Sequence, residues 1–238
     1  MPMTTSASGN TTDCDLIDLD SNPTKSNSEY FCASIRKNRI LSNFIRVDEG
    51  IYVPSTKQTF LTVEAAYVHL VRFRGASVHL FNKDGVFGSI EMFMEWWNGL
   101  QEKKPTISFN PKYWAEKSGD GIVAKTLTSN TPFAKFVRGK FDLDFPNPDT
   151  YNAAEHDKIW SELHEAKFTA SKLFRDTLLA TSGKFLYEFD RAGGRKKMKG
   201  RHSIVTWGGC FARDENNVER FHGRNIMGQM LMNLRDAY

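Results

Sequence analysis

Trp207-Gly208-Gly209-Cys210 and, after a polar loop, His222-Gly223-Arg224-Asn225-Ile226 begin the part of this sequence around which the fold is organised. After Asn225, large apolar residues recur about every four positions, as they do on one face of a helix. They are Ile226, Met227, Met230, Leu231 and Leu234. The pattern predicts a helix from about Asn225 to Asp236 whose broad apolar stripe faces a core.

The start of this helix carries a possible ligand site. Gly223 permits a tight turn, and Asn225 is a good N-cap residue, which would leave backbone N–H groups directed outward. A phosphate or ribose suits such a position, and the guanidinium of Arg224 suits phosphate. The alternative is that these residues form only a helix start and that Trp207 is only a core aromatic.

Composition favours one large domain, or one domain with a tail. The 238 residues are 40% hydrophobic, which suffices for a substantial core. Cys14, Cys32 and Cys210 form no C-x-x-C pair and leave an odd thiol, which favours a reducing compartment. We therefore expect an intracellular protein, cytoplasmic or nuclear, without a membrane span or secretion signal.

No motif in the sequence calls for a metal or a cofactor. The six histidines are scattered, and His156 and His164 stand eight positions apart, a spacing that no metal motif requires. Neither a G-x-G-x-x-G sequence after a strand nor a Walker loop occurs. We expect neither a metal ion nor a cofactor.

The net charge of +4 is unevenly distributed. Residues 1–30 hold Lys25 against five acidic residues, so the rest has 31 basic and 23 acidic residues, a surplus of eight positive charges. Six Lys or Arg residues fall between Arg191 and Arg201. Phosphate contact is one interpretation of this loop, through Arg195, Lys196, Lys197 and Arg201, and a solvated loop is the other.

Residues 1–29 read as a disordered tail, because they are polar and acidic and hold few large apolar residues. Its apolar island, between Asp15 and Asp20, is either a docking motif for another protein or a chance occurrence. The folded domain is then expected to span residues 30–238.

Short strands and turns are expected from Ile45 to Phe60. Residues 62–73 then predict a helix with Thr62 as its N-cap and with Val63, Tyr67, Leu70 and Val71 on its apolar side. Glu64 falls in the first turn, where the helix dipole favours a carboxylate. A surface glutamate at such a place is also common.

Further helices are predicted within residues 75–104, through Ile90, Phe93, Trp97 and Leu100, and across residues 153–181, with a break near Phe168 to Ser171. Five prolines in residues 105–152 instead suggest an irregular segment with one or two short helices. The expected fold class is mainly α with a small β portion, that is, α+β.

Six fragments in order resemble the signature of the NADAR family, also called YbiA-like. They are Leu41-Ser42-Asn43-Phe44, Thr62-Val63-Glu64-Ala65-Ala66-Tyr67, Ala166-Lys167-Phe168, Leu178-Leu179-Ala180-Thr181-Ser182-Gly183 with Leu186-Tyr187-Glu188, Trp207-Gly208, and Gly223-Arg224-Asn225-Ile226-Met227-Gly228 with Leu231-Met232-Asn233-Leu234-Arg235. The resemblance implies a compact single domain of orthogonally packed helices, with an insertion at residues 75–150. It also implies an N-glycosidase, since members cleave ribosylamino intermediates of riboflavin synthesis or remove ADP-ribose from guanine in nucleic acid.

Carried over position by position, the resemblance makes Glu64 the principal catalytic carboxylate. A fixed carboxylate stabilises the oxocarbenium-like state formed when a base leaves C1 of ribose, or guides water to it. The resemblance and the aromatic residues near its fragments imply a substrate-binding set, in which an aromatic wall stacks on the base. That set is Ser42, Asn43, Phe44, Tyr67, Trp160, Trp207, Gly208, Gly209, Gly223, Arg224 and Asn225.

The sequence departs from the family pattern at three places. The lysine expected seven residues after the glutamate, a candidate for Schiff-base chemistry, is Val71, followed by Arg72. Ile204, next to Ser203, replaces an aspartate, and Trp160 stands seven rather than about fourteen residues before Lys167. Either Lys167 or another amine supplies the nucleophile, or the route is direct hydrolysis, or the protein only binds.

Three functional hypotheses follow. The first is an N-glycosidase that removes ADP-ribose from ADP-ribosylated guanine in DNA or nucleotides, which the basic loop favours. The second is an N-glycosidase of phosphorylated ribosylamino intermediates. The third is a catalytically silent module that binds ADP-ribose or nucleic acid. The sequence leaves the oligomeric state open.

Overall fold

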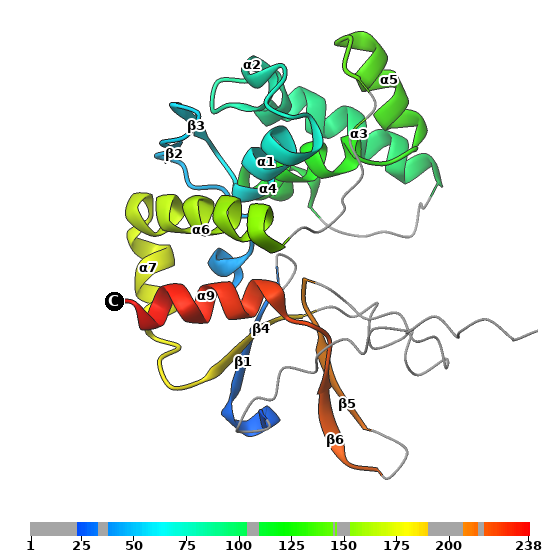
Figure 1. The fold of residues 1–238 in the computed structure, drawn as a ribbon. Helices are drawn as coiled ribbons and strands as arrows, with labels where there is room; N and C mark the ends of the chain where they lie inside the picture. Colours follow the sequence, from blue (N-terminus) through cyan, green and yellow to red (C-terminus); the bar gives the residue numbers. More distant parts are fainter. Residues whose placement is uncertain are drawn as a thin grey trace, which may run out of the picture.

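The computed structural model describes residues 23–32, 38–103, 110–144, 146, 153–189, 207–213 and 217–238. Within them it contains eight α-helices and three small two-stranded sheets, which confirms the mainly helical α+β class (Figure 1). Most of the predicted tail and all of the basic loop, with Arg195, Lys196, Lys197 and Arg201, lie outside the described residues.

The helices are α1 (Val63–Tyr67), α2 (Val78–Phe81), α3 (Ile90–Lys103), α4 (Pro111–Leu127), α5 (Pro132–Lys140), α6 (Ala153–Ala170), α7 (Lys172–Leu179) and α9 (Ile226–Asp236). The strands are β1 (Ser28–Phe31), β2 (Ile51–Val53), β3 (Gln58–Phe60), β4 (Phe185–Glu188), β5 (Cys210–Arg213) and β6 (Glu219–His222). A short 3-10 turn at Lys25–Asn27 and the first residues of β1 fall within the segment predicted as tail.

Strand pairing links distant parts of the chain. β1 pairs with β4 in parallel, with Tyr30 opposite Tyr187, whereas β2–β3 and β5–β6 are antiparallel. An isolated bridge between Phe189 and Gly209 joins the end of β4 to the start of β5. The predicted β patch at residues 45–60 is the β2–β3 hairpin.

The predicted helix at residues 62–73 forms, but its second half is a π-helix, Val68–Arg72. The hydroxyl of Thr62 accepts the Ala65 N–H at 3.1 Å, which confirms Thr62 as the N-cap. A π-helix has a wider turn, which rotates the face that points inward. Val68 is therefore fully buried, whereas the predicted core residues Leu70 and Val71 are only partly buried.

Two helices form in residues 105–152, as expected, but the prediction that they are short and that the segment is mainly irregular was wrong. α4 and α5 occupy most of it, and each begins with a proline directly after a capping residue. Asn110 accepts the Tyr113 N–H, and Thr131 accepts the Ala134 N–H. Proline is well tolerated at the first position of a helix, where its missing N–H has no partner anyway.

The remaining helix predictions are confirmed. α3 covers the predicted segment, although Ile90 is 45% exposed while Phe93 is fully buried. The break in the long helical run falls at Ser171, whose hydroxyl caps α7 by accepting the Phe174 N–H at 3.1 Å. α9 starts at Ile226 and ends at Asp236.

α6 is the element that connects the helical part to the C-terminal part. It packs against α1 and β2 on one side and α9 on the other, and in Figure 1 it crosses between α1 and α9. Its buried residues Trp160, Leu163 and Phe168 belong to the single large hydrophobic core. Anything held between α1 and α9 is therefore positioned by α6.

α9 and β4 approach closely at Gly228. A Cβ at this position would collide with the carbonyl oxygen of Leu186 and with the side-chain amide of Asn225. Only a glycine leaves room for the contact, which seats α9 on the sheet.

Replacing Gly228 with alanine should destabilise the protein by about 1–3 kcal/mol through overpacking. Gly99 gives the matched control, because it lies inside α3 and a Cβ added there would meet nothing within 4 Å. Gly99→Ala should stabilise by up to about 1 kcal/mol, because alanine has the higher helix propensity. Urea unfolding of both variants measures the difference, and a Gly228→Ala protein as stable as the wild type would contradict the close contact.

Candidate functional site

Glu64 lies in the first turn of α1 and is 5% exposed. Its Oε1 is 3.3 Å from Nζ of Lys125, which projects from α4 and has a side chain that is 46% exposed. A positive charge at this distance stabilises the carboxylate form of Glu64. The predicted catalytic carboxylate is thus buried, paired with an amine and set at a helix start.

Asn43 connects this helix to α9. Its carbonyl oxygen accepts the Glu64 N–H at 3.1 Å, and its side-chain amide lies 3.6 Å from Sδ of Met227 in the first turn of α9. The same amide lies 3.1 Å from Nε2 of His164 on α6. Asn43 is 4% exposed, so these contacts are made in a largely water-free interior. One residue therefore touches all three helices that surround the candidate site.

The protonation of His164 follows from its surroundings. Burial, with the nearby Lys167 as a second cause, lowers the pKa of His164 to about 3, so the ring is neutral near pH 7. Nδ1 lies 2.8 Å from the carbonyl oxygen of Trp160, which can only accept, so Nδ1 carries the single proton. Nε2 lies 3.1 Å from Oδ1 of Asn43, whose Nδ2 donates to Sδ of Met227 at 3.6 Å.

Three predicted aromatic residues come together, and one of them, Tyr67, lies on the same helix as Glu64. Tyr67, one helical turn after Glu64, stacks on Trp160 with ring centroids 4.2 Å apart. Trp207 meets both rings edge-on, at 6.1 Å from Tyr67 and 5.5 Å from Trp160. Trp160 is 2% exposed and Tyr67 is equally buried, whereas Trp207 is only partly buried. Trp207 is thus the ring of this cluster best exposed for stacking on a base.

The N-terminus of α9 differs from the prediction. Asn225 occupies the N-cap position in a left-handed conformation, φ 50°, but its side chain makes no capping hydrogen bond. Its amide instead donates to Leu186 O at 2.9 Å and accepts from Glu188 N at 3.3 Å, both in β4. The prediction that Asn225 caps the helix was therefore wrong, because the side chain bridges to the neighbouring sheet.

Carbonyl groups of the Trp207–Gly208 segment accept hydrogen bonds from N–H groups at the start of α9. Met227 N donates to Trp207 O at 3.0 Å, and Asn225 N donates to Gly208 O at 3.3 Å. Gly223, with φ 138°, lies so close to Gly208 and Gly209 that a side chain would collide with their backbone. These glycines bring the two predicted fragments together, and Arg224 is exposed beside them.

Lys167 is fully buried, and its Nζ donates to the carbonyl oxygens of Ile40 and Ser42, both at 2.8 Å. Burial lowers its pKa to about 7. The amine lies under the backbone that leads to Asn43, where it fixes the segment from Ile40 to Ser42. Ser42 is buried, and Phe44 is half-buried beside α4. The amine that faces Glu64 is Lys125 and not Lys167.

Lys125 and Asp120, both on α4, were not among the residues predicted for the site. Asp120 is 2% exposed, and its Oδ2 accepts the hydroxyl hydrogen of Thr62 at 2.8 Å. The Asn110-Pro111 pair, a cap followed by proline, was the signal that a helix starts there. This signal would have predicted that both residues lie on a helix and not in a loop. It would not have predicted that the helix packs beside Glu64.

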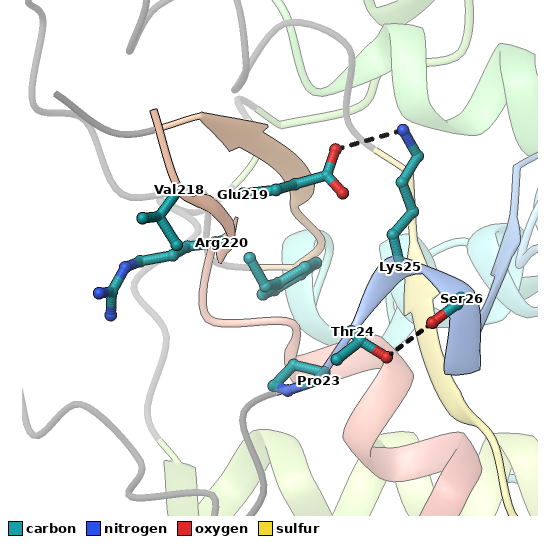
Figure 2. A pocket seen from close by; sticks show the side chains of 8 residues that line it. Pro23, Thr24, Lys25, Ser26, Val218, Glu219 and Arg220 are labelled. Carbon is teal, nitrogen blue, oxygen red and sulfur yellow. Dashed lines mark hydrogen bonds and ion pairs between the residues drawn. The ribbon is translucent and has the colours of Figure 1, made fainter. Parts of the chain in front are cut away.

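A hollow of about 670 Å³ lies elsewhere, between the turn at Pro23–Ser26 and strand β6 (Figure 2). Lys25 and Glu219 form an ion pair across it at 3.3 Å, and Arg220 points outward. None of the predicted site residues lines it. We place the candidate site at Glu64, because its helix carries Tyr67 of the aromatic cluster and is joined through Asn43 to α6 and α9.

No group of three or more His, Cys, Asp or Glu residues in the described ranges is arranged to hold a metal ion. No helix in the described part of the chain is long and apolar enough to cross a membrane.

Comparison of the chain with protein-family models, with curated proteins and with solved structures gives no match. The geometry of the site and the sequence resemblance are therefore the basis for assigning a function.

The lowered pKa of Lys167 predicts that the free energy of unfolding rises with pH. Its pKa is about 7 in the folded protein against an ordinary value of 10.5, so between these values the unfolded chain binds more protons. Under that condition the free energy of unfolding increases from pH 7 toward pH 10.5.

Lys167→Met should remove this contribution, and Lys158→Met, at an exposed position of the same helix, should not. Denaturant unfolding at pH 7, 8.5 and 10 measures the slopes. A Lys167→Met slope equal to that of the wild type would show that the buried amine does not titrate in this range.

Proposed function

We propose that the protein is an N-glycosidase that breaks the bond between a base and C1 of ribose. The observation that carries the proposal is the junction at Asn43, whose carbonyl accepts from Glu64 N and whose amide reaches Met227 at the start of α9. It supports a single site to which both helix starts contribute. The aromatic cluster of Tyr67, Trp160 and Trp207 beside it suits a base.

In the proposed reaction, water attacks C1 as the bond from C1 to the base nitrogen breaks. The water oxygen becomes bonded to C1, and the proton that it loses is balanced by the proton that the leaving base gains. The carboxylate of Glu64 stabilises the positive charge that develops on the sugar and orients the water. Lys125, which is half-exposed, is suited to pair with a phosphate of the incoming substrate and thereby leave Glu64 facing the sugar.

The proposed substrate is ADP-ribosylated guanine in DNA or in a nucleotide. The surplus of positive charge in residues 31–238 favours a polyanion over a small molecule. This choice, together with the NADAR or YbiA-like form of a single domain, rests on the sequence resemblance. The alternatives are a phosphorylated ribosylamino compound as substrate, or a module that binds ADP-ribose or nucleic acid without cleaving it.

Glu64→Gln should reduce release of the base by roughly 10²–10³-fold, because it removes the charge that stabilises the transition state. Glu91→Gln is the matched control, since Glu91 also occupies the first turn of a helix but is exposed. The measurement is chromatography of products after incubation with an ADP-ribosylated guanine oligonucleotide and with a ribosylamino phosphate.

The outcomes separate the three hypotheses. Release from the oligonucleotide by the wild type, and its loss only in Glu64→Gln, supports the proposal. Release from the ribosylamino phosphate alone supports the second hypothesis. Tight binding without release from either substrate supports the binding module and contradicts the proposed activity.

Lys125 variants distinguish direct hydrolysis from a covalent route. In the covalent route the Lys125 amine would displace the base at C1 and form an imine with the opened ribose, which water then hydrolyses. Arginine keeps the positive charge but cannot form an imine.

For direct hydrolysis we expect Lys125→Arg to retain activity within about tenfold, and Lys125→Gln to lose more, because only the charge is needed. The wild type should give no adduct on treatment with borohydride during turnover. An adduct at Lys125 by mass spectrometry, with Lys125→Arg as inactive as Lys125→Gln, would replace hydrolysis with the covalent route.

A further inference from the structure

Asp120 is a carboxylate whose burial opposes folding. Its Oδ1 is 4.0 Å from Nε of Arg46, beyond hydrogen-bond length, and has no hydrogen-bond partner among the described residues. Burial raises the pKa of Asp120 to about 6, against the opposing effects of Arg46, the Thr62 hydroxyl and the backbone of Gly121. The group is still ionised at pH 7.5, and burying such a charge opposes folding.

The carboxylate of Asp120 fixes the direction in which the hydroxyl of Thr62 donates its hydrogen bond. Oδ2 of Asp120 can only accept, so the single hydroxyl proton of Thr62 is committed to it at 2.8 Å. The lone pairs of the Thr62 oxygen are then available to the Ala65 N–H, which is bonded at 3.1 Å. The first turn of α1 is thereby closed by the chain Asp120, Thr62 and Ala65.

Glu64 lies inside this turn. Its own N–H is bonded to Asn43 O at 3.1 Å, so the turn is held by Asn43 at Glu64 and by Thr62 at Ala65. α4 approaches so closely that a Cβ at Gly121 would lie 3.1 Å from the Thr62 hydroxyl oxygen. The backbone that carries the Glu64 carboxylate therefore has little freedom.

A helix cap by itself does not require a carboxylate, since a threonine hydroxyl already caps the helix. What a carboxylate offers is two oxygens that both accept, one toward Thr62 and one toward Arg46. An amide would turn a donor toward one of these two donors. Residues that oppose folding stability are found most often at functional sites. Asp120 is such a residue, and one hydrogen bond connects it to the turn that holds Glu64.

We propose that Asp120 is a positioning residue, which fixes the Glu64 carboxylate for the reaction by holding the hydroxyl of Thr62. The inference rests on the proposed function, because it assigns the task of Glu64 to that reaction. It also gives the segment from residue 75 to 150 a part in the site, since α4 carries Asp120 as well as Lys125.

The test uses four variants of the full chain: Asp120→Asn, Thr62→Val, the double variant, and Thr62→Ser as the matched control that keeps the hydroxyl. The measurements are kcat and KM on the ADP-ribosylated guanine oligonucleotide, hydrogen exchange of the Ala65 amide by NMR, and thermal unfolding to confirm that each variant is folded.

We expect Asp120→Asn and Thr62→Val each to lower kcat by roughly ten- to a hundredfold, because small displacements of a catalytic group have effects of that size. KM should change by less than about threefold, since substrate binding is not the interaction lost. The Ala65 amide should exchange faster in both variants. The double variant should lose no more than the worse single one, because both changes break the same chain of contacts.

Thr62→Ser should behave as the wild type, and if Asp120→Asn does not fold, the contrast between Thr62→Val and Thr62→Ser decides the question. Wild-type kcat in Asp120→Asn, or losses that multiply in the double variant, would overturn the proposal. If the wild type itself releases no base, the proposed function fails. The exchange of the Ala65 amide then decides the structural part alone, and unchanged exchange in Asp120→Asn would overturn it.

Discussion

The hydrogen bonds of Asn43 are the constraint on which the candidate site depends. The residue is buried where α1, α6 and α9 meet, and it uses its carbonyl for one helix and its amide for the other two. A buried amide is tolerated only when its polar groups are satisfied, so each helix must be in place for the others to be stable. The neutral state of His164 belongs to this arrangement, since a charged imidazole at that place would have to be desolvated.

Three basic side chains around the site serve different purposes. Lys167 donates to backbone carbonyls and holds the approach to Asn43, whereas Lys125 pairs with Glu64 and also reaches solvent. The two lysines have different surroundings, since Lys167 is fully buried and the side chain of Lys125 is 46% exposed. Arg46 is the third, and it donates to Ala115 O at 3.3 Å and faces Asp120.

Much of the fold could be predicted from local sequence. Periodicity gave α3, α6, α7 and α9, and the cap at Thr62 gave the start of α1, because capping and burial leave clear patterns. The prolines at 111 and 132 misled the prediction, since a proline starts a helix as readily as it ends one. The π-helical turn at Val68–Arg72 gave no signal in the apolar spacing, which had placed Leu70 and Val71 in the core.

The site itself was only partly predictable. The fragments that resemble a known family identified Glu64, Asn43, Tyr67 and Trp207, which the structure brings together. Lys125 and Asp120 were not predictable, because their contacts cross 61 and 58 positions of the chain and depend on how α4 lies against α1. The side chain of Asn225 was misjudged for the same reason, since its partner strand is 37 to 39 residues away in sequence.

The contact between Asn43 and Met227 spans 184 positions of the chain. Contacts between residues so far apart slow folding, because a long loop must close before they contribute any stability. During synthesis this contact can form only after α9 has left the ribosome. Under the function proposed above, a growing chain would hold its carboxylate without the rest of the site, and it would act on its substrate only after α9 had docked.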